Sequence, residues 1–326
     1  MIRVAVLDDW QNIARECADW SALSARAEVT FFTEAFANED DAAARLRDFE
    51  IVLSMRERTP LPASLIGRLD RLKMLGITGV KNASLDQGAC TARGVVVCNT
   101  TGYPDSVSAP AELALGLLLA VVRDIPAADA GMRAGRFQAG IPAGITLAGK
   151  TLGLVGLGRL GARMACYGHA LEMKVLAWSQ NLTAATAAAA GAELVTKEEL
   201  FARSDAISVH LVLSPRSRHI IGTAEIGRMK PGAVLINTSR GPLIDEDALV
   251  LALEQRRIHA GLDVFDCEPL PAHHRLRTVP NTVLTPHVGY TVVETMRHFY
   301  AQSVENAVAF LDGRPIRVAN PEVQAH

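Results

Sequence analysis

Short apolar runs alternate with longer segments of helical periodicity along the whole chain, and this alternation sets the first expectation about the fold. Runs that are apolar on successive residues are typical of strands buried on both faces of a parallel sheet. We predict strands at Val4–Leu7, Val29–Phe32, Ile51–Leu53, Met74–Ile77, Val95–Cys98, Thr151–Val155, Lys174–Trp178, Ala206–Leu211, Ala233–Ile236, Gly261–Val264 and Thr282–Leu284. We predict helices between them, for example at Ala42–Phe49, Leu160–Leu171 and Asp245–Gln255. The alternation predicts an α/β protein with doubly wound parallel sheets.

A change in composition near the middle of the chain predicts two domains. Residues 131–149 are rich in glycine, and a clear strand, turn and helix begin at Thr151. The helical run Thr291–Leu311 has no predicted strand beside it, so we expect it to pack back on the first domain. We therefore predict a first domain of residues 1–103 and 291–326, with a second domain of residues 104–290 inserted into it.

The composition narrows the class of protein. The 326 residues are 49% hydrophobic and 21% charged with a net charge of −2, which excludes a largely disordered chain and gives no basic excess for a nucleic-acid partner. The longest apolar run, Leu113–Val122, is about half the roughly 20 residues that a membrane helix needs, so it predicts a buried helix. Five scattered cysteines without a C-x-x-C pair, and an N-terminus that reads as a strand, predict a cytoplasmic location.

A glycine-rich turn follows the strand predicted at Thr151–Val155 and precedes a helix, which is the context of a G-x-G-x-x-G motif. The first glycine permits a tight turn, the second lets the backbone approach a pyrophosphate, and the third brings the helix close to the strand. The exposed amides and the positive end of the helix dipole then hold the anion. We predict that a dinucleotide binds at Gly156, Gly158, Arg159, Leu160 and Gly161.

The end of the next strand leaves the choice of dinucleotide open. An acid usually stands there and holds the ribose diol of NAD. This chain has Ser179 instead, followed by Gln180 and Asn181. No carboxylate is present to repel the 2′-phosphate of NADP, and no basic residue is adjacent to attract it. Ser179 could bind either ribose, so NAD and NADP both stay possible.

Three strands in the second half of the chain are followed by side chains suited to acid–base and carbonyl chemistry. The first is followed by Thr238, Ser239 and Arg240, the second by Asp263 and Glu268, and the third by His287. Ligands of open parallel sheets bind beyond the carboxyl ends of the strands, so we expect these residues to meet at one edge. Nothing in the spacing suits a metal site. His273 and His274 are adjacent in a proline-flanked loop and are predicted to lie on the surface.

Four motifs together resemble those of the D-isomer-specific 2-hydroxyacid dehydrogenases. They are Leu147–Gly153 before the glycine turn, Asn237–Gly241, Leu262–Phe265 with Glu268-Pro269, and Thr285–Gly289. The resemblance covers nearly the whole chain. It implies a Rossmann dinucleotide-binding domain inserted into a flavodoxin-like substrate domain. It further implies a homodimer that uses NAD or NADP to interconvert a small 2-oxo acid and its D-2-hydroxy acid. From the charge balance and the short apolar runs we expect no nucleic-acid or membrane partner.

The resemblance also implies roles for individual residues. His287 resembles the group that protonates the carbonyl oxygen, and Glu268 resembles the carboxylate that favours its imidazolium form. Arg240 resembles the residue that binds the carboxylate and carbonyl of the substrate, which its planar fork suits. Asp263 resembles the group that orients the nicotinamide carboxamide. Thr238, Ser239 and Gly289 would also lie along the cofactor.

The first domain is expected to supply a loop for the substrate carboxylate. The corresponding stretch is Leu75–Asn82, with binding expected from Gly79, Val80 and Lys81. The family usually has a glycine where this chain has Lys81, so the loop either is disturbed there or gains charge for a dianionic substrate. Upstream, Met55–Thr59 resembles the basic segment of phosphoglycerate dehydrogenases. In that segment Arg56 is a candidate for binding substrate, and Arg58 is either a phosphate ligand or a solvated charge.

Two alternatives to a reductase of a small 2-oxo acid stay open. One is a phosphoglycerate dehydrogenase-like activity in the same class. The other is a dinucleotide-sensing, corepressor-like protein that binds protein partners and turns over little substrate. Retention of Arg240, Glu268 and His287 does not separate these, whereas hydride transfer at ordinary enzyme rates would.

Overall fold

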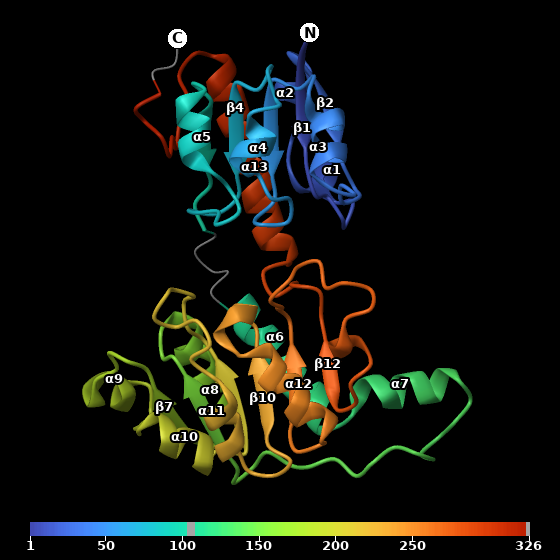
Figure 1. Cartoon of the computed structure of the whole chain (residues 1–326), viewed down its shortest axis with the longest axis vertical. Coiled ribbons are helices and arrows are strands. Elements are labelled where there is room, and N and C mark those ends of the chain that lie inside the picture. The colour runs from blue at the N-terminus through green and yellow to red at the C-terminus, as the bar shows by residue number, and fades with distance from the viewer. Residues whose placement is uncertain (103–107, 324–326) are drawn as a thin grey trace. The chain divides into compact units, whose positions relative to one another are not determined.

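The computed structural model describes residues 1–102 and 108–323 and shows a chain of two compact units (Figure 1). Unit 1 comprises Met1–Ser106 and Thr291–His326, and unit 2 comprises Val107–Tyr290. Among the described residues, unit 1 has a five-stranded sheet and unit 2 a seven-stranded sheet, and the paired strands are parallel. The predicted α/β class is confirmed. The boundary predicted between residues 103 and 104 lies outside the described residues.

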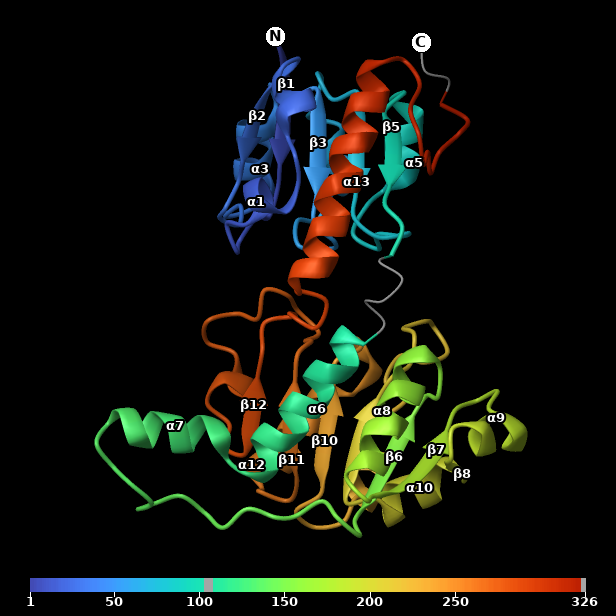
Figure 2. The same cartoon turned by 180° about the vertical axis from the view of Figure 1, so that it is seen from behind.

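Unit 1 has the strand order β2-β1-β3-β4-β5, which is the flavodoxin-like order. Its strands are β1 (Ile2–Val6), β2 (Ala27–Phe31), β3 (Ile51–Ser54), β4 (Met74–Ile77) and β5 (Val96–Asn99). One face carries α3 (Glu39–Leu46), α4 (Ala63–Ile66) and α5 (Gln87–Ala92); the other carries α1 (Ala14–Cys17), α2 (Ser21–Ser24) and α13 (Val293–Leu311). Figure 2 shows α13 lying across the strands of this unit, although it is encoded after the whole of unit 2.

Unit 2 has the strand order β12-β11-β10-β9-β6-β7-β8, which is the Rossmann order with one further strand. Its strands are β6 (Thr151–Val155), β7 (Lys174–Trp178), β8 (Glu193–Leu194), β9 (Ala206–Val209), β10 (Val234–Asn237), β11 (His259–Leu262) and β12 (Thr282–Leu284). Its helices are α6 (Ala109–Val122), α7 (Ile125–Arg133), α8 (Arg159–Ala170), α9 (Ala184–Ala189), α10 (Lys197–Arg203), α11 (Thr223–Arg228) and α12 (Glu246–Glu254), with short 3₁₀ turns at Gly241–Leu243 and Arg275–Arg277. α6 and α8 cover one face of the sheet, and α10, α11 and α12 cover the other (Figures 1 and 2).

The cores explain why the strands read as continuous apolar runs. Every residue of β3, β4, β9 and β10 is buried, because helices cover both faces of each sheet. The apolar run Leu113–Val122 lies within α6, where Leu117 and Leu118 are buried against the sheet. It is therefore the buried helix that the sequence predicts. None of the helices described in residues 1–102 and 108–323 is long and apolar enough to cross a membrane.

Predicted and observed elements differ mainly at their ends. β9 stops at Val209 rather than Leu211, and β11 stops at Leu262 rather than Val264, so polar residues begin earlier than predicted. The helix predicted at Ala42–Phe49 instead spans Glu39–Leu46, because Asn38 caps it by accepting the Asp41 amide at 3.0 Å. β8 was not predicted, since its two residues are exposed at the sheet edge and form no apolar run.

Candidate functional site

The glycine turn between β6 and α8 is held by close backbone packing. Gly156 has a φ of +100°, and a Cβ there would lie 2.6 Å from the carbonyl oxygen of His210. A Cβ on Gly161 would lie 2.2 Å from the carbonyl oxygen of Gly156. The Gly156 amide donates to the Trp178 carbonyl at 2.8 Å, which ties the turn to β7. A side chain at Gly156 or Gly161 would therefore open the turn.

Gly158, the N-cap of α8, is the open member of the motif. A Cβ at this position would meet nothing within 4 Å, and the residue is exposed. No side chain caps the helix, and its first turn holds no acid. The first amides and the positive end of the helix dipole are thus left for an anion. This geometry fits a dinucleotide pyrophosphate.

His210 is a neighbour of the turn that sequence reasoning missed, because the predicted strand ran past it to Leu211. Its Nε2 lies 2.9 Å from the Ser208 hydroxyl, and its buried Nδ1 has no hydrogen-bond partner among the described residues. Burial lowers the pKa of His210 to about 4, so its imidazole is neutral near pH 7. Because β9 ends at Val209, His210 follows the strand directly and lies at the edge of the sheet.

The end of β7 lies beside a loop that is distant in sequence. Ser179 is half-buried, and the side-chain Nε2 of Gln180 donates to the Arg216 carbonyl at 3.5 Å. Arg216 is exposed in the loop after β9. The sequence indicated no basic residue next to Ser179, and along the chain there is none. The fold nevertheless brings the Arg216 segment to this end of the sheet.

The loop after β10 is ordered by its own polar groups. The Asn237 side chain accepts the Ser239 amide at 3.0 Å and donates to the Arg240 carbonyl at 2.9 Å. The Ser239 hydroxyl donates to the Val209 carbonyl at 2.7 Å. Arg240 is half-buried, and its Nη1 donates to the Ser239 carbonyl at 2.7 Å. The Thr238 hydroxyl is buried without a hydrogen-bond partner among the described residues, which leaves it a capacity that a ligand could use.

Asp263 anchors the loop that carries His287. It is fully buried and accepts the Thr285 hydroxyl at 2.6 Å and the Val288 and Gly289 amides at 2.8 and 2.9 Å. Burial raises the pKa of the Asp263 carboxyl, while these bonds and the nearby His287 oppose the rise. A Cβ on Gly289 would lie 3.1 Å from the Asp263 carboxylate, so the glycine allows this close approach.

His287 and Glu268 form a short hydrogen-bonded pair at the same edge. His287 Nδ1 lies 2.5 Å from Glu268 Oε2, and the other carboxylate oxygen of Glu268 accepts the Phe265 amide at 2.8 Å. The side chains are 27% and 33% exposed, so the pair is reachable from solvent. An imidazole whose Nδ1 faces a carboxylate keeps Nε2 for proton exchange with a ligand.

The backbone of His287 is in a conformation that non-glycine residues rarely adopt. Its φ is +53°, which costs about 1–3 kcal/mol when the surrounding structure enforces it. The His287 amide donates to the Asp263 carbonyl at 2.8 Å, and the Asp263 amide donates to the Asn237 carbonyl at 3.0 Å. These bonds link the ends of β10, β11 and β12. The structure therefore brings together the three strand ends that the sequence singled out.

In unit 1, Arg56 and Gly79 pack on one another at the ends of β3 and β4. Arg56 has a φ of +52°, and Gly79 has a φ of +88°. A Cβ on Gly79 would lie 1.9 Å from Arg56 Nη1, so the arginine lies across the glycine. Arg56 Nη1 donates to the Thr78 carbonyl at 3.2 Å, and its Nη2 lies 3.6 Å from a Glu57 carboxylate oxygen. The guanidinium therefore holds its own loop.

Arg58 is also engaged within unit 1. Its Nη1 donates to the Asp8 carbonyl at 2.7 Å and to the Gln11 side chain at 3.1 Å, and it lies 4.7 Å from the Trp10 ring centroid. Arg58 is half-buried, and its readings as a phosphate ligand or a solvated loop charge both stay predictions. Val80 and Lys81 are exposed, and the Lys81 ammonium makes no ion pair within the described part of the chain.

The prediction for the adjacent histidines is half right. His273 is exposed, but His274 is half-buried and its Nε2 lies 3.0 Å from Glu246 Oε1. Proline-flanked loops are usually solvated. Nothing in the sequence indicated that α12 would place the Glu246 carboxylate beside His274.

Comparison with known proteins identifies the family. Residues 115–289 match the profile of the NAD binding domain of the D-isomer specific 2-hydroxyacid dehydrogenases, which is more than half of the chain. The chain belongs to the D-isomer specific 2-hydroxyacid dehydrogenase family. The resemblance stated from the sequence motifs is confirmed, and unit 2 carries the NAD binding domain of this family.

Several relatives share most of the chain. It is 36% identical over 272 residues to the glyoxylate reductase of Aeropyrum pernix, covering 81% of each chain. It is 37% identical over 262 residues to the D-3-phosphoglycerate dehydrogenase of Methanocaldococcus jannaschii, covering 79% of this chain but 49% of that one. The chain thus spans about half the length of that relative. A solved structure of a putative D-3-phosphoglycerate dehydrogenase from Ralstonia solanacearum has a TM-score of 0.91 at 36% identity and covers 100% of this chain and 99% of its own.

Proposed function

We propose that this protein is an NAD- or NADP-dependent dehydrogenase that interconverts a small 2-oxo acid and its D-2-hydroxy acid. The observation that carries the proposal is the 2.5 Å pair of His287 and Glu268 at the edge of the sheet whose β6 leads into the glycine turn. A proton donor held by a carboxylate beside a dinucleotide site is the arrangement that reduction of a carbonyl requires. Family membership supports the same reaction class.

The proposed division of labour follows from where each side chain lies. The bound dinucleotide supplies or accepts the hydride. His287 gives a proton to the carbonyl oxygen from Nε2, and Glu268 stabilises the imidazolium that provides it. Arg240 binds the carboxylate of the substrate through its planar guanidinium. Asp263 fixes the His287 loop, and its predicted bond to the nicotinamide carboxamide stays a prediction.

The glycine turn and the neighbouring strand ends would hold the dinucleotide. Gly158 leaves room for the pyrophosphate, and the amides of Arg159, Leu160 and Gly161 begin the helix that faces it. Ser179 stands where the ribose is expected and favours neither nucleotide by charge. Arg216, whose backbone carbonyl accepts the Gln180 side chain, is the basic residue that would favour NADP, so both cofactors belong in the test.

The substrate is proposed only as a class. Names of relatives include both glyoxylate reductase and D-3-phosphoglycerate dehydrogenase. A phosphoglycerate-like substrate would need basic groups for its phosphate, yet Arg56 and Arg58 both hold backbone groups of unit 1. The geometry therefore favours a small 2-oxo acid. Binding of substrate by Arg56, Gly79, Val80 and Lys81 stays a prediction.

We also propose that the protein is a homodimer. Within unit 2, α7 and the extended segment after it project from the sheet (Figure 1). Several apolar side chains of this region are exposed. These are Ile125, Met132, Phe137 and Ile145, with Phe137 being 76% exposed. Clustered exposed apolar groups mark interaction surfaces. Phe137→Asp should shift the sedimentation coefficient to that of a monomer, and a monomeric parent protein would contradict the proposal.

The free cysteines support the predicted cytoplasmic location.

The experiment that tests the activity follows the absorbance of NADH and NADPH with a panel of 2-oxo acids. The panel contains glyoxylate, hydroxypyruvate, pyruvate, oxaloacetate and phosphohydroxypyruvate. We expect turnover of roughly 1–1000 per second with at least one of them. Nucleotide binding without turnover of any acid would instead support the sensor alternative.

A further inference from the structure

The loop that carries Glu268 is tied to α12 by a pair of side chains that the proposed reaction does not use. This loop comprises residues 265–278 of the connection between β11, which ends at Leu262, and β12, which begins at Thr282. Glu246 opens α12, and its Oε1 lies 3.0 Å from Nε2 of His274 in the loop. The two side chains are 22% and 23% exposed, so the pair is largely shielded from water.

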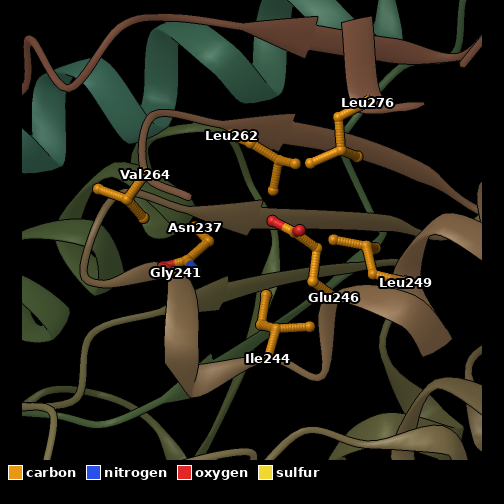
Figure 3. A pocket seen from close by; sticks show the side chains of 8 residues that line it. All are labelled: Asn237, Gly241, Ile244, Glu246, Leu249, Leu262, Val264 and Leu276. Atoms are coloured by element: carbon orange, nitrogen blue, oxygen red, sulfur yellow. The ribbon is translucent and has the colours of Figure 1, made fainter. Parts of the chain in front are cut away.

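The surroundings of Glu246 are mostly apolar. Figure 3 shows its carboxyl group among Leu262, Leu276, Leu249 and Ile244, which line a small pocket together with Asn237, Gly241 and Val264. A carboxylate in such surroundings is costly unless it is hydrogen-bonded. The 3.0 Å contact with His274 Nε2 is therefore worth more than a similar contact on an open surface.

The hydrogen bonds assign the proton on His274. Its Nδ1 accepts the Leu276 amide at 3.3 Å, which leaves the proton on Nε2, the nitrogen that lies 3.0 Å from Glu246 Oε1. The second oxygen of Glu246 accepts the Asp266 amide at 3.5 Å. One carboxylate thus holds the loop at two points, and Glu268 lies between them in sequence.

The contacts continue from Asp266 to the proposed acid–base pair. The Phe265 amide donates to Glu268, whose other oxygen meets His287. A Cβ on Gly241 would lie 2.1 Å from the carbonyl carbon of Phe265, so the turn before α12 abuts the start of the loop. A displacement of the loop from α12 would therefore move the Glu268 carboxylate.

We propose that Glu246 and His274 are positioning residues, which hold the loop so that Glu268 meets His287. This inference rests on the proposed function, because it assigns the pair a role in that reaction. Neither residue touches the reacting atoms. Their loss should lower kcat and leave nucleotide binding unchanged.

The chain offers a matched control that joins the same two elements. Glu254, also on α12, accepts two hydrogen bonds from Arg275, of 2.7 and 3.2 Å. These side chains are 41% and 56% exposed, and Arg275 is the direct neighbour of His274. Exposed ion pairs contribute little to stability, so Glu254→Gln removes a tether of the same loop with little effect.

The test compares kcat, KM for NADH and Tm for Glu246→Gln, Glu254→Gln, Glu268→Gln and the Glu246→Gln/Glu268→Gln double variant. We expect Glu246→Gln to lower kcat about 10- to 100-fold with KM for NADH within about twofold of the parent, as for a misplaced catalytic group. Glu254→Gln should keep parental kcat. The double variant should be no slower than Glu268→Gln alone, because both changes act through one carboxylate. Equal losses in Glu246→Gln and Glu254→Gln, or losses that multiply in the double variant, would overturn the proposal.

Two further measurements test the positioning role: kcat of His274 variants, and hydrogen exchange of the Phe265 amide. Should Glu246→Gln fail to fold, His274→Gln retains a donor for Glu246 and should preserve kcat better than His274→Leu; equal losses in these two would count against the pair. Hydrogen exchange of the Phe265 amide, which bonds Glu268, needs no turnover. It should quicken in Glu246→Gln but not in Glu254→Gln, and this readout separates the positioning claim from failure of the proposed reaction. Unchanged exchange in both variants would contradict it.

Discussion

The carboxyl edges of the two sheets carry similar charged side chains and use them in different ways. In unit 1, Arg56 and Arg58 hold backbone carbonyls of their own unit, and buried Asp8 accepts the Thr59 hydroxyl at 2.7 Å. In unit 2, His287 and Glu268 meet each other and remain about one third exposed. The charged side chains at this edge therefore stabilise loops in unit 1, whereas in unit 2 they form the proposed acid–base pair.

The difference lies in what fixes each loop. In unit 2, buried Asp263 and Asn237 accept the backbone amides of the loops, and the acid–base pair of His287 and Glu268 lies beside them. In unit 1, Arg56 and Arg58 themselves bind the backbone carbonyls of the loops. A count of charged residues at a sheet edge thus does not measure its capacity to bind substrate.

The largest effect on kcat is expected for His287, at the carboxyl edge of the unit 2 sheet. His287→Ala should lower kcat about 10²- to 10⁴-fold, as loss of a general acid does, while NADH binding stays near the parental value. Steady-state turnover and fluorescence titration of NADH measure the two quantities. His273→Ala, on the exposed neighbour of His274, should match the parent in both, and parental turnover in His287→Ala would remove the residue from the reaction.

A stability change is expected next, at Asp8 in unit 1. Burial raises the pKa of Asp8 from 3.8 to about 6, so folding favours the protonated carboxyl. The contribution is fully present below about pH 4 and is lost as the pH rises through about 6. Asp8→Asn does not ionise, so its stability relative to the parent should increase between pH 4 and pH 7 by up to ~3 kcal/mol.

Hydrogen exchange in β1 and β3 at the two pH values measures this change within unit 1. Asp70→Asn alters a carboxylate whose side chain is 88% exposed and should change little at either pH. A relative stability of Asp8→Asn that falls with rising pH would contradict the assignment.

A smaller effect on kcat/KM is expected for Arg240, whose proposed role is to bind the carboxylate of the substrate. Arg240→Lys keeps the charge but loses the planar fork, and we expect kcat/KM for the 2-oxo acid to fall about tenfold or more. The KM for NADH should stay unchanged, since the loss concerns the substrate. Arg228→Lys, on α11, serves as the control, and parental kinetics in Arg240→Lys would place the guanidinium outside the site.

The smallest effect concerns Lys81, an exposed charge of unit 1. If it binds a second anionic group, Lys81→Ala should raise KM for oxaloacetate or phosphohydroxypyruvate roughly threefold to tenfold, with KM for glyoxylate unchanged. Lys73→Ala provides the match, because Lys73 is exposed at the opposite end of β4. Equal KM changes for all acids would assign Lys81 a structural role only.

Much of the architecture could be predicted because burial on both faces marks the strands directly. The glycine turn and the three strand ends of unit 2 were also visible, since each depends on residues adjacent in sequence. The use of Arg56 by its own loop could not be predicted, because it depends on a positive φ and on Gly79 approaching from another strand. The Glu246–His274 pair could not be predicted either, because its two residues are 28 positions apart and only the tertiary fold brings them together.

The return of the chain to unit 1 bears on the order in which the protein is made. The segment after α13 pairs with β5, where the Asn320 side chain accepts the Val97 amide at 2.8 Å and donates to the Val95 carbonyl at 2.9 Å. A ribosome that has just finished β12 has supplied every strand of unit 2, whereas unit 1 still lacks α13 and this β5 contact. The nucleotide-binding half can therefore mature first, while the strands of unit 1 wait for α13, which begins at Val293, 194 residues after β5 ends at Asn99.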